Sequence, residues 1–237
     1  MPDRFEGGDA AVMVSGGVDS AVLAVDLLRR FDRVHPIYVR CGLRWEPIEL
    51  AALRTFLAAV ERPGLMPLRV LDEPIADVYG DHWSTSRPDV PTADSPDEAV
   101  YLPGRNLLLV AKAAIWCRLR EVPDLALGCL ASNPFPDSTP DFFASFEVVL
   151  EKALASRIRL LRPFEGMHKS DVLKRGDRLP LHLTFSCLKP INGGHCGHCN
   201  KCAERRRGFA EVGRVDHTAY ASISAQHVGR SQAGCIE

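Results

Sequence analysis

The stretch AVMVSGGVDSAVLA, residues 11–24, constrains the fold of this chain more than any other. Residues 10–14 form a short unbroken apolar run, which is typical of a strand buried on both faces of a parallel sheet. Gly16 and Gly17 permit a sharp turn and a close approach of a ligand to bare backbone. Apolar residues with helical spacing follow. A strand, a glycine turn and a helix N-terminus together predict an anion site, most often for phosphate; a tight turn without a ligand is the alternative.

The string SGGVDS within this stretch is more specific than a glycine pair. It is neither G-x-x-x-x-G-K-[ST] nor G-x-G-x-x-G, but it resembles the S-G-G-x-D-S motif of the ATP pyrophosphatases, the PP-loop family. The resemblance implies binding of ATP and magnesium, cleavage between the α- and β-phosphates, and catalytic roles for Ser15, Asp19 and Ser20. It also implies a set of ATP-binding residues: Val14, Ser15, Gly16, Gly17, Val18, Asp19, Ser20, Ala21, Val22, Leu23 and Ala24.

Composition limits the classes of function. The net charge of −1 over 237 residues argues against a nucleic-acid-coating protein, so we expect no stable nucleic-acid partner. No stretch approaches the roughly 20 apolar residues of a membrane span, and the polar, acidic start is not typical of a signal peptide. We therefore expect a cytoplasmic protein without a membrane partner.

Strand and helix patterns alternate along the chain. This alternation predicts an α/β fold with a doubly wound parallel sheet, whose ligands gather beyond the carboxyl ends of the strands. The expected strands after 10–14 are 34–40, 67–71, 124–130 and 158–163, and the expected later helices are 46–60, 105–120 and 140–155.

Domain organisation follows from the same pass along the chain. We expect a PP-loop domain over 10–180, a small C-terminal metal-binding helical region over 181–222, and a tail over 223–237. The segment 72–104 is rich in Pro, Asp and Ser, and connections of that length are usually functional or disordered. It is interpreted either as a lid over the nucleotide or as a loose surface loop.

Four cysteines crowd into FSCLKPINGGHCGHCNKC with the spacing C-x8-C-x2-C-x2-C. This spacing predicts one structural zinc ion per chain, held by Cys187, Cys196, Cys199 and Cys202. An iron–sulfur cluster is the main competitor, because four cysteines also ligate such clusters, and disulfides are the weaker alternative. The nearby histidines, His195 and His198, either replace a cysteine ligand or are simply solvated.

The strings SGGVDS and YLPGRN, together with SC followed by CGHCNKC and RRRGF, resemble the 7-cyano-7-deazaguanine synthase family over about residues 11–220. The resemblance implies zinc on the four cysteines, a homodimer, and ATP-dependent conversion of 7-carboxy-7-deazaguanine and ammonia to the nitrile. Two ATP are consumed, and each adenylates an oxygen of the small-molecule substrate before that oxygen leaves as part of AMP.

Further residues enter by this resemblance. Arg105 and Asn106 match a family string near the nucleotide, although Arg105 could simply cap a surface turn. Lys169 occupies the place of a family lysine that precedes a helix and is expected to be catalytic, by neutralising the leaving pyrophosphate; an exposed helix-start lysine is the alternative. Phe135 and Asp137 are expected to bind the substrate ring, by stacking and by hydrogen bonding. The block 205–207 is interpreted as a solvated helix face.

Three strings depart from the family pattern, namely RCGLRWEPIE, ASNPFPDSTPDFF and SCL. By resemblance they surround the purine-like ring, so the identity of the acceptor stays open. The alternatives are a related PP-loop enzyme that forms an amide or nitrile on another carboxylate, a tRNA-thiolating enzyme, and a non-catalytic nucleotide-binding module.

Overall fold

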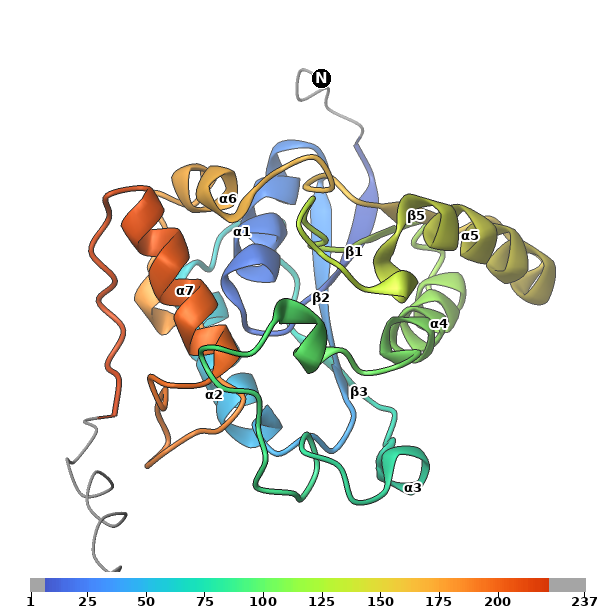
Figure 1. The fold of residues 1–237 in the computed structure, drawn as a ribbon. Coiled ribbons are helices and arrows are strands. Elements are labelled where there is room, and N and C mark those ends of the chain that lie inside the picture. Colours follow the sequence, from blue (N-terminus) through green and yellow to red (C-terminus); the bar gives the residue numbers. More distant parts are fainter. Residues whose placement is uncertain (1–6, 222–237) are drawn as a thin grey trace, which may run out of the picture.

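A five-stranded parallel sheet of order β3-β2-β1-β4-β5 forms the centre of the structure, a computed structural model that describes residues 7–221 (Figure 1). Its strands are β1 (Asp9–Met13), β2 (Arg33–Arg40), β3 (Arg69–Asp72), β4 (Asp124–Ala126) and β5 (Arg159–Leu161). The helices are α1 (Val18–Asp26), α2 (Glu46–Ala59), α3 (Ala76–Tyr79), α4 (Arg105–Arg118), α5 (Pro140–Leu154), α6 (Lys169–Arg175) and α7 (Asn200–Glu211). The predicted doubly wound α/β fold is confirmed.

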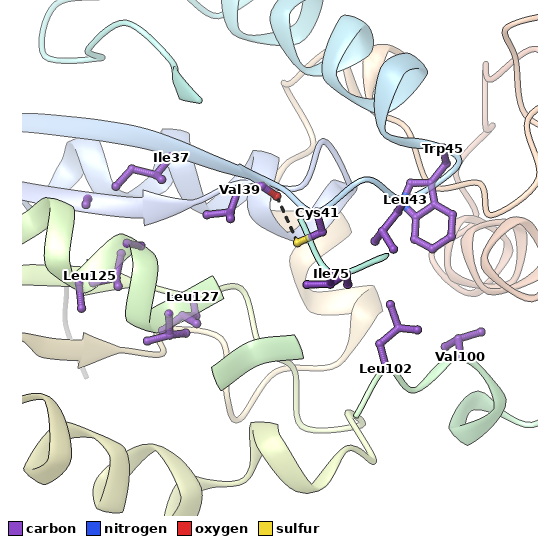
Figure 2. Packing of buried hydrophobic residues seen from close by; sticks show 14 of the residues in the cluster. Ile37, Val39, Cys41, Leu43, Trp45, Ile75, Val100, Leu102, Leu125 and Leu127 are labelled. Atoms are coloured by element: carbon purple, nitrogen blue, oxygen red, sulfur yellow. Dashed lines mark hydrogen bonds between the residues drawn. The ribbon is translucent and has the colours of Figure 1, made fainter. Parts of the chain in front are cut away.

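Both faces of the sheet are covered because successive strand residues point to opposite sides. Ala11, Ile37 and Leu125 pack in one core with α4 and α5. Ala10 and Val12 pack in a second core with residues of α1, α2 and α6. Figure 2 shows how the first core continues past the strand ends to side chains of the 72–104 segment. Burial on both faces explains why residues 10–14 are an unbroken apolar run.

The strand predictions were correct in place but too long at the second sheet edge. The predicted strand 124–130 ends at Ala126, and the predicted strand 158–163 spans only Arg159–Leu161. The chain leaves β4 early because Gly128 turns it against the start of α1, where a Cβ on Gly128 would lie 3.3 Å from Ser20 N. The three predicted later helices match α2, α4 and α5 to within two residues at each end.

The segment 72–104 is a packed wall, so its interpretation as a loose surface loop was wrong. Trp83, Val90 and Leu102 are buried in the first core. The Arg44 guanidinium fastens the segment by donating to the carbonyl oxygens of Trp83 and Arg87. Residues 91–97 run beside the cysteine loop, to which they are joined by backbone hydrogen bonds. The segment is mostly polar in composition, but these few large apolar side chains attach it to the core.

The strand order places a topological switch point between β1 and β4. The chain builds outward from β1 to β2 and β3, then crosses to β4 and β5 on the other side. In such sheets ligands bind in the crevice beyond the carboxyl ends of the strands at the switch point. The SGGVDS string follows β1 at this position. Among the described residues, no helix has both the length and the apolar character needed to cross a membrane.

Candidate nucleotide and acceptor site

The phosphate loop, residues 15–20, is held by its own serines. The Ser15 N–H donates to Ser20 Oγ at 3.1 Å, and the Ser20 hydroxyl donates to the Gly17 carbonyl at 3.2 Å. Gly16 has a φ of +77°, and a Cβ there would lie 3.1 Å from the Cγ of Glu49 on α2. Both the positive φ and the close approach require glycine. The conformation of the loop is therefore held by contacts within the protein.

The N-terminus of α1 faces this loop. Gly17 is the N-cap and supplies no side-chain hydrogen bond to the first turn. The first backbone N–H groups of a helix lack partners within the helix, and with the helix dipole they favour an anion. Gly128, which the sequence analysis did not single out, lets the end of β4 approach this turn. Its position two residues after the end of a buried strand is the sequence signal that could have identified Gly128 as a close-approach residue.

Only part of the predicted ATP-binding stretch reaches open space. Val14, Ser15, Gly17, Val18, Asp19 and Ser20 line cavities. Ala21, Val22, Leu23 and Ala24 are at most 1 % exposed and lie in the core. Their side chains secure α1 against the sheet and its neighbours.

Two cavities meet at the phosphate loop. The sheet-edge cavity, of about 210 Å³, lies at the carboxyl ends of β1, β2 and β4. The tryptophan cavity, of about 240 Å³, lies between the loop, the 72–104 segment and α7. Residues that line both are Ser15, Gly17, Asp19, Arg105 and Asn106. The two cavities are therefore neighbours that share the phosphate loop and the start of α4.

Aromatic side chains line the tryptophan cavity. Trp45 and Trp83 stack with ring centroids 5.8 Å apart, and Tyr101 stacks on Phe135 at 5.3 Å. Of these four residues, the sequence analysis singled out only Phe135. The string RCGLRWEPIE, noted there as a departure from the family pattern, contributes Trp45 and Glu49 to the cavity. Aromatic rings of this kind suit a flat apolar or heterocyclic ligand.

Asp137 caps α4 in addition to lining the tryptophan cavity. Its Oδ2 accepts from the Asn106 backbone N–H at 3.0 Å, and its Oδ1 accepts from the Asn106 side-chain amide at 3.3 Å. Burial raises the pKa of Asp137 above its usual range although these hydrogen bonds oppose the shift. Beside it, Arg105 points into both cavities, and its buried Nε has no hydrogen-bond partner among the described residues. Part of the hydrogen-bonding capacity of Asp137 is thus used within the protein.

Lys169 joins the phosphate loop to α7. Its Nζ lies 2.6 Å from Asp19 Oδ2 and 3.0 Å from Glu204 Oε1, and Glu204 also pairs with Lys201 at 2.6 Å. Burial alone lowers the pKa of Lys169, but the two carboxylates outweigh it and raise the pKa above its ordinary value. Lys169 therefore lies at the phosphate loop, paired with two carboxylates, and its catalytic role stays a prediction. Glu204 and Lys201 were missed because their distance from Asp19 in sequence gives no signal.

The four cysteines of the C-x8-C-x2-C-x2-C motif converge on one point. All four are buried, and their Sγ atoms lie within 4.8 Å of one another. The distances that the structure gives between Cys196 and Cys202 and between Cys187 and Cys199 are 3.9 and 4.0 Å. A tetrahedron with metal–sulfur bonds of about 2.3 Å has edges of about 3.8 Å.

The chemistry around the sulfurs also suits a metal. The backbone N–H groups of Leu188, Cys196 and Cys199 donate to cysteine sulfurs at 3.2–3.4 Å, which favours thiolates. The disulfide interpretation was wrong, because these cysteines are free thiols. A multi-iron cluster would spread its thiolates over separate irons, whereas this group closes around a single ion. The cysteine group can therefore bind one metal ion.

Two expectations around the cysteine loop need correction. His195 is neither solvated nor a ligand of the cysteine group: it is buried against Phe185, and its Nε2 accepts from the Ser186 N–H at 3.0 Å. His198 is exposed, as the solvated alternative held.

Within the 205–207 block, Arg205 is 3 % exposed and only the other two arginines face solvent. Arg205 is buried because one face of α7 packs on the main domain.

The fold and the loop together define a class: an α/β nucleotide-binding protein of the PP-loop type, with a cysteine group that can bind a metal ion. The chain belongs to the QueC family, whose model, described as queuosine biosynthesis protein QueC, matches residues 9–213.

Curated relatives agree with the family assignment. The chain is 34% identical over 225 residues to the 7-cyano-7-deazaguanine synthase of Methanothrix thermoacetophila, covering 90% of this chain and 99% of the relative. It is 32% identical over 223 residues to the enzyme of the same name from Stenotrophomonas maltophilia, with the same coverage of both chains. A solved structure from Methanocaldococcus jannaschii, titled a predicted subunit of tRNA methyltransferase, aligns with a TM-score of 0.47 at 17% identity over 91% of this chain and 93% of that one. That likeness is too distant to bear on function.

Proposed function

We propose that this chain is an ATP-dependent enzyme that converts 7-carboxy-7-deazaguanine and ammonia to 7-cyano-7-deazaguanine. The observation that carries the proposal is the pair of cavities sharing the phosphate loop. A carboxylate substrate must meet the α-phosphate of ATP, so two ligand sites have to touch at the loop. Membership of the QueC family and the names of the relatives supply the substrate.

The nucleotide occupies the sheet-edge cavity in this proposal. Val14 and Val39 offer apolar walls for the adenosine part. The triphosphate lies on Ser15 to Ser20 at the start of α1, and Lys169 and Arg105 face its charge. Asp19 is the residue for magnesium, because its Oδ1 is buried and has no hydrogen-bond partner among the described residues, although carboxylate oxygens are ligands that magnesium prefers.

The carboxylic acid substrate, 7-carboxy-7-deazaguanine, occupies the tryptophan cavity in this proposal. Tyr101 and Phe135 present stacked rings on one side, and Trp45 and Trp83 present another aromatic wall. Asp137 keeps free lone pairs beyond its bonds to Asn106, and these accept from the amino and ring N–H groups of a guanine-like edge. The carboxylate of the substrate then points toward Arg105 and the loop.

The chemistry is adenylation followed by displacement, carried out twice. A carboxylate oxygen attacks the α-phosphorus, the bond to the β-phosphate oxygen breaks, and pyrophosphate leaves. Ammonia attacks the acyl carbon, and the carbon–oxygen bond breaks to release AMP and leave the amide. The amide oxygen is adenylated by a second ATP, and loss of AMP with the remaining nitrogen protons gives the nitrile. The residues contribute positioning and stabilisation of charge.

Zinc is proposed for the cysteine group, one ion per chain. Four thiolates complete a tetrahedral shell and leave no open position, so the ion is structural. It holds the cysteine loop that begins α7, and α7 delivers Glu204 and Lys201 to the cavity. We do not place zinc in the reaction.

We also propose a cytoplasmic homodimer. Free cysteines suit a reducing compartment. The outer surfaces of α4 and α5 expose Ile115 at 47% and Val149 at 55%, together with Leu107, Leu119 and Val148. Exposed apolar side chains on these two helices fit an interface with a second copy.

The test is the identity of the nucleotide products by mass spectrometry. Zinc-loaded protein with 7-carboxy-7-deazaguanine, ammonia and ATP is expected to yield the nitrile, AMP and pyrophosphate. Asp19→Asn is expected to lower AMP formation by roughly 100-fold or more with little change in Tm, because Lys169 keeps its pair with Glu204. The exposed Asp94→Asn is the matched control. ADP and phosphate as sole products would contradict the proposal.

A related ligase acting on another carboxylic acid is the second candidate, because the divergent string RCGLRWEPIE lines the tryptophan cavity. This second candidate predicts that AMP forms only with a different carboxylic acid, and that no AMP forms with 7-carboxy-7-deazaguanine. Nucleotide binding without AMP formation from any acid would favour a non-catalytic module.

A further inference from the structure

Glu49 is a buried carboxylate that the chemistry above does not use. It lies on α2, is 8 % exposed and lines the tryptophan cavity. The Tyr38 hydroxyl donates to its Oε2 at 2.7 Å, which fixes the carboxylate. The structure gives Oε1 no hydrogen-bond partner among residues 7–221. Glu49 thus offers a carboxylate oxygen with unused lone pairs to a ligand in the tryptophan cavity.

The surroundings of Glu49 suit a small cation. Trp45 lies one helical turn earlier on α2, where its carbonyl accepts from the Glu49 N–H at 3.0 Å. Its ring lines the same cavity, stacked on Trp83. On the other side, Glu49 packs directly against Gly16 of the phosphate loop. The Glu49 side chain thus lies beside the phosphate loop and lines the same cavity as the two tryptophan rings.

Three charged or titratable groups face Glu49. Burial raises the pKa of Glu49 to about 8, with Glu46 of α2 adding to the rise, while the Tyr38 hydroxyl of β2 and the Arg105 guanidinium of α4 oppose it. A carboxylate with a raised pKa binds a proton more strongly than an ordinary carboxylate, which suits a proton acceptor.

We propose that Glu49 and Trp45 form the binding site for ammonium and that Glu49 removes one proton from it, delivering ammonia to the adenylated acid. The proposal rests on the function proposed above and names the residues that handle its nitrogen substrate.

The chemical need is specific. Ammonia in neutral water is mostly ammonium, which carries no lone pair and cannot attack carbon. A carboxylate accepts one of its N–H groups, and the face of a tryptophan ring attracts the cation. Transfer of one proton to Glu49 leaves ammonia, whose lone pair forms the C–N bond as AMP departs with the electrons of the broken C–O bond. The surplus proton on the new nitrogen passes to solvent, and Glu49 releases its own proton before the next turnover.

The experiment separates adenylation from nitrogen transfer in Glu49→Gln. Acid-dependent exchange of pyrophosphate into ATP reports adenylation without any nitrogen source. Amide formation from ammonium reports the proposed step. Hydroxamate formation from hydroxylamine, which is largely uncharged at neutral pH, reports capture by a nucleophile that needs no deprotonation. Glu61→Gln, on an exposed glutamate just beyond α2, is the matched control.

We expect Glu49→Gln to keep pyrophosphate exchange and hydroxamate formation within a few-fold of the parent chain, while amide formation from ammonium falls by roughly 10²–10⁴-fold. Equal loss with both nitrogen sources, or undiminished use of ammonium, would overturn the proposal. Absence of pyrophosphate exchange in the parent chain would instead refute the proposed function, and the ammonium site with it.

A second variant tests the proton transfer. Tyr38→Phe removes a donor that stabilises the charged carboxylate, so the pKa of Glu49 is expected to rise. The pH profile of the ammonium-dependent rate should shift to higher pH, and the hydroxylamine-dependent rate should not follow. A purely structural role for Glu49 predicts no such difference, so parallel profiles would also overturn the proposal.

Discussion

Replacing Arg205 by methionine tests whether the buried polar cluster under α7 holds the C-terminal region in place. The guanidinium donates to Thr184 Oγ1 and to the Leu181 carbonyl, each at 2.8 Å, and to the two carboxylate oxygens of Asp216 at 3.2 and 3.4 Å. Methionine keeps an apolar stem of similar length and removes every donor. The residues that lose their partner lie on both sides of α7.

The expected loss is about 3 kcal/mol. Removing one partner of a buried ion pair costs about 3–5 kcal/mol. The lower end applies here, because Asp216 still accepts from the Tyr220 hydroxyl and the Thr218 N–H. For a chain of this size, 3 kcal/mol corresponds to a fall in Tm of roughly 6–12 °C. Thermal and urea unfolding of protein with matched metal content measure both quantities.

Arg207→Met is the matched control, since this exposed arginine lies in the same RRR block. It is expected to change the free energy of unfolding by less than about 0.5 kcal/mol. A double-mutant cycle with Asp216→Asn should give a coupling energy of at least about 1 kcal/mol. If Arg205→Met costs no more than Arg207→Met, the assignment of Arg205 to the buried interior is refuted.

Three further predictions concern the metal, the assembly and the substrate. Metal analysis is expected to find one zinc per chain, and Cys199→Ser should abolish it and unfold the C-terminal region, because metal binding supplies folding energy; stoichiometric iron and sulfide with a visible absorption band would contradict this. Ile115→Asp on the exposed face of α4 should convert a dimer to a monomer in sedimentation experiments, whereas Val78→Asp on α3, which is also exposed, should not; a parent chain that sediments as a monomer would refute the interface. Asp137→Ala should weaken binding of 7-carboxy-7-deazaguanine far more than binding of ATP in titration calorimetry, because a ring donor loses its acceptor, and loss of the α4 cap should add about 1 kcal/mol of destabilisation; equal weakening of both ligands would leave the cap as the only role of Asp137.

Motifs that are contiguous in sequence could be interpreted without the structure. SGGVDS predicted a strand, a glycine turn and a helix because each requirement concerns neighbouring residues, and the turn is formed by residues 15–20 as expected. The cysteine spacing predicted one metal site for the same reason, since a short loop brings its four thiols together. The helices 46–60, 105–120 and 140–155 followed from apolar periodicity.

The partners of these motifs could not be found in this way. Lys169 was expected near the phosphates only by family resemblance, and its links to Asp19 and Glu204 span 150 and 35 residues of sequence. Arg205 was assigned to a solvated face because a run of three arginines gives no sign of which one is buried. Asp137 was expected only to bind the substrate, and its hydrogen bond to the start of α4 could not be foreseen. Asp137 lies in the connection after β4, whereas α4 lies in the connection between β3 and β4.

The sequence by itself determined the class of sheet, the turn after β1, the cysteine cluster and the family, because local backbone preferences, apolar periodicity and cysteine spacing are properties of adjacent residues. Tertiary structure decided which side chains share a cavity. The alternation of strands across the switch point brought α2, α4, the 72–104 segment and α7 around one loop. Only that packing placed Glu49 beside Gly16 and in the same cavity lining as Trp45. Burial then raised the pKa of Glu49, since the pKa of a carboxyl group depends on the solvent and charges around it and not on its neighbours in sequence.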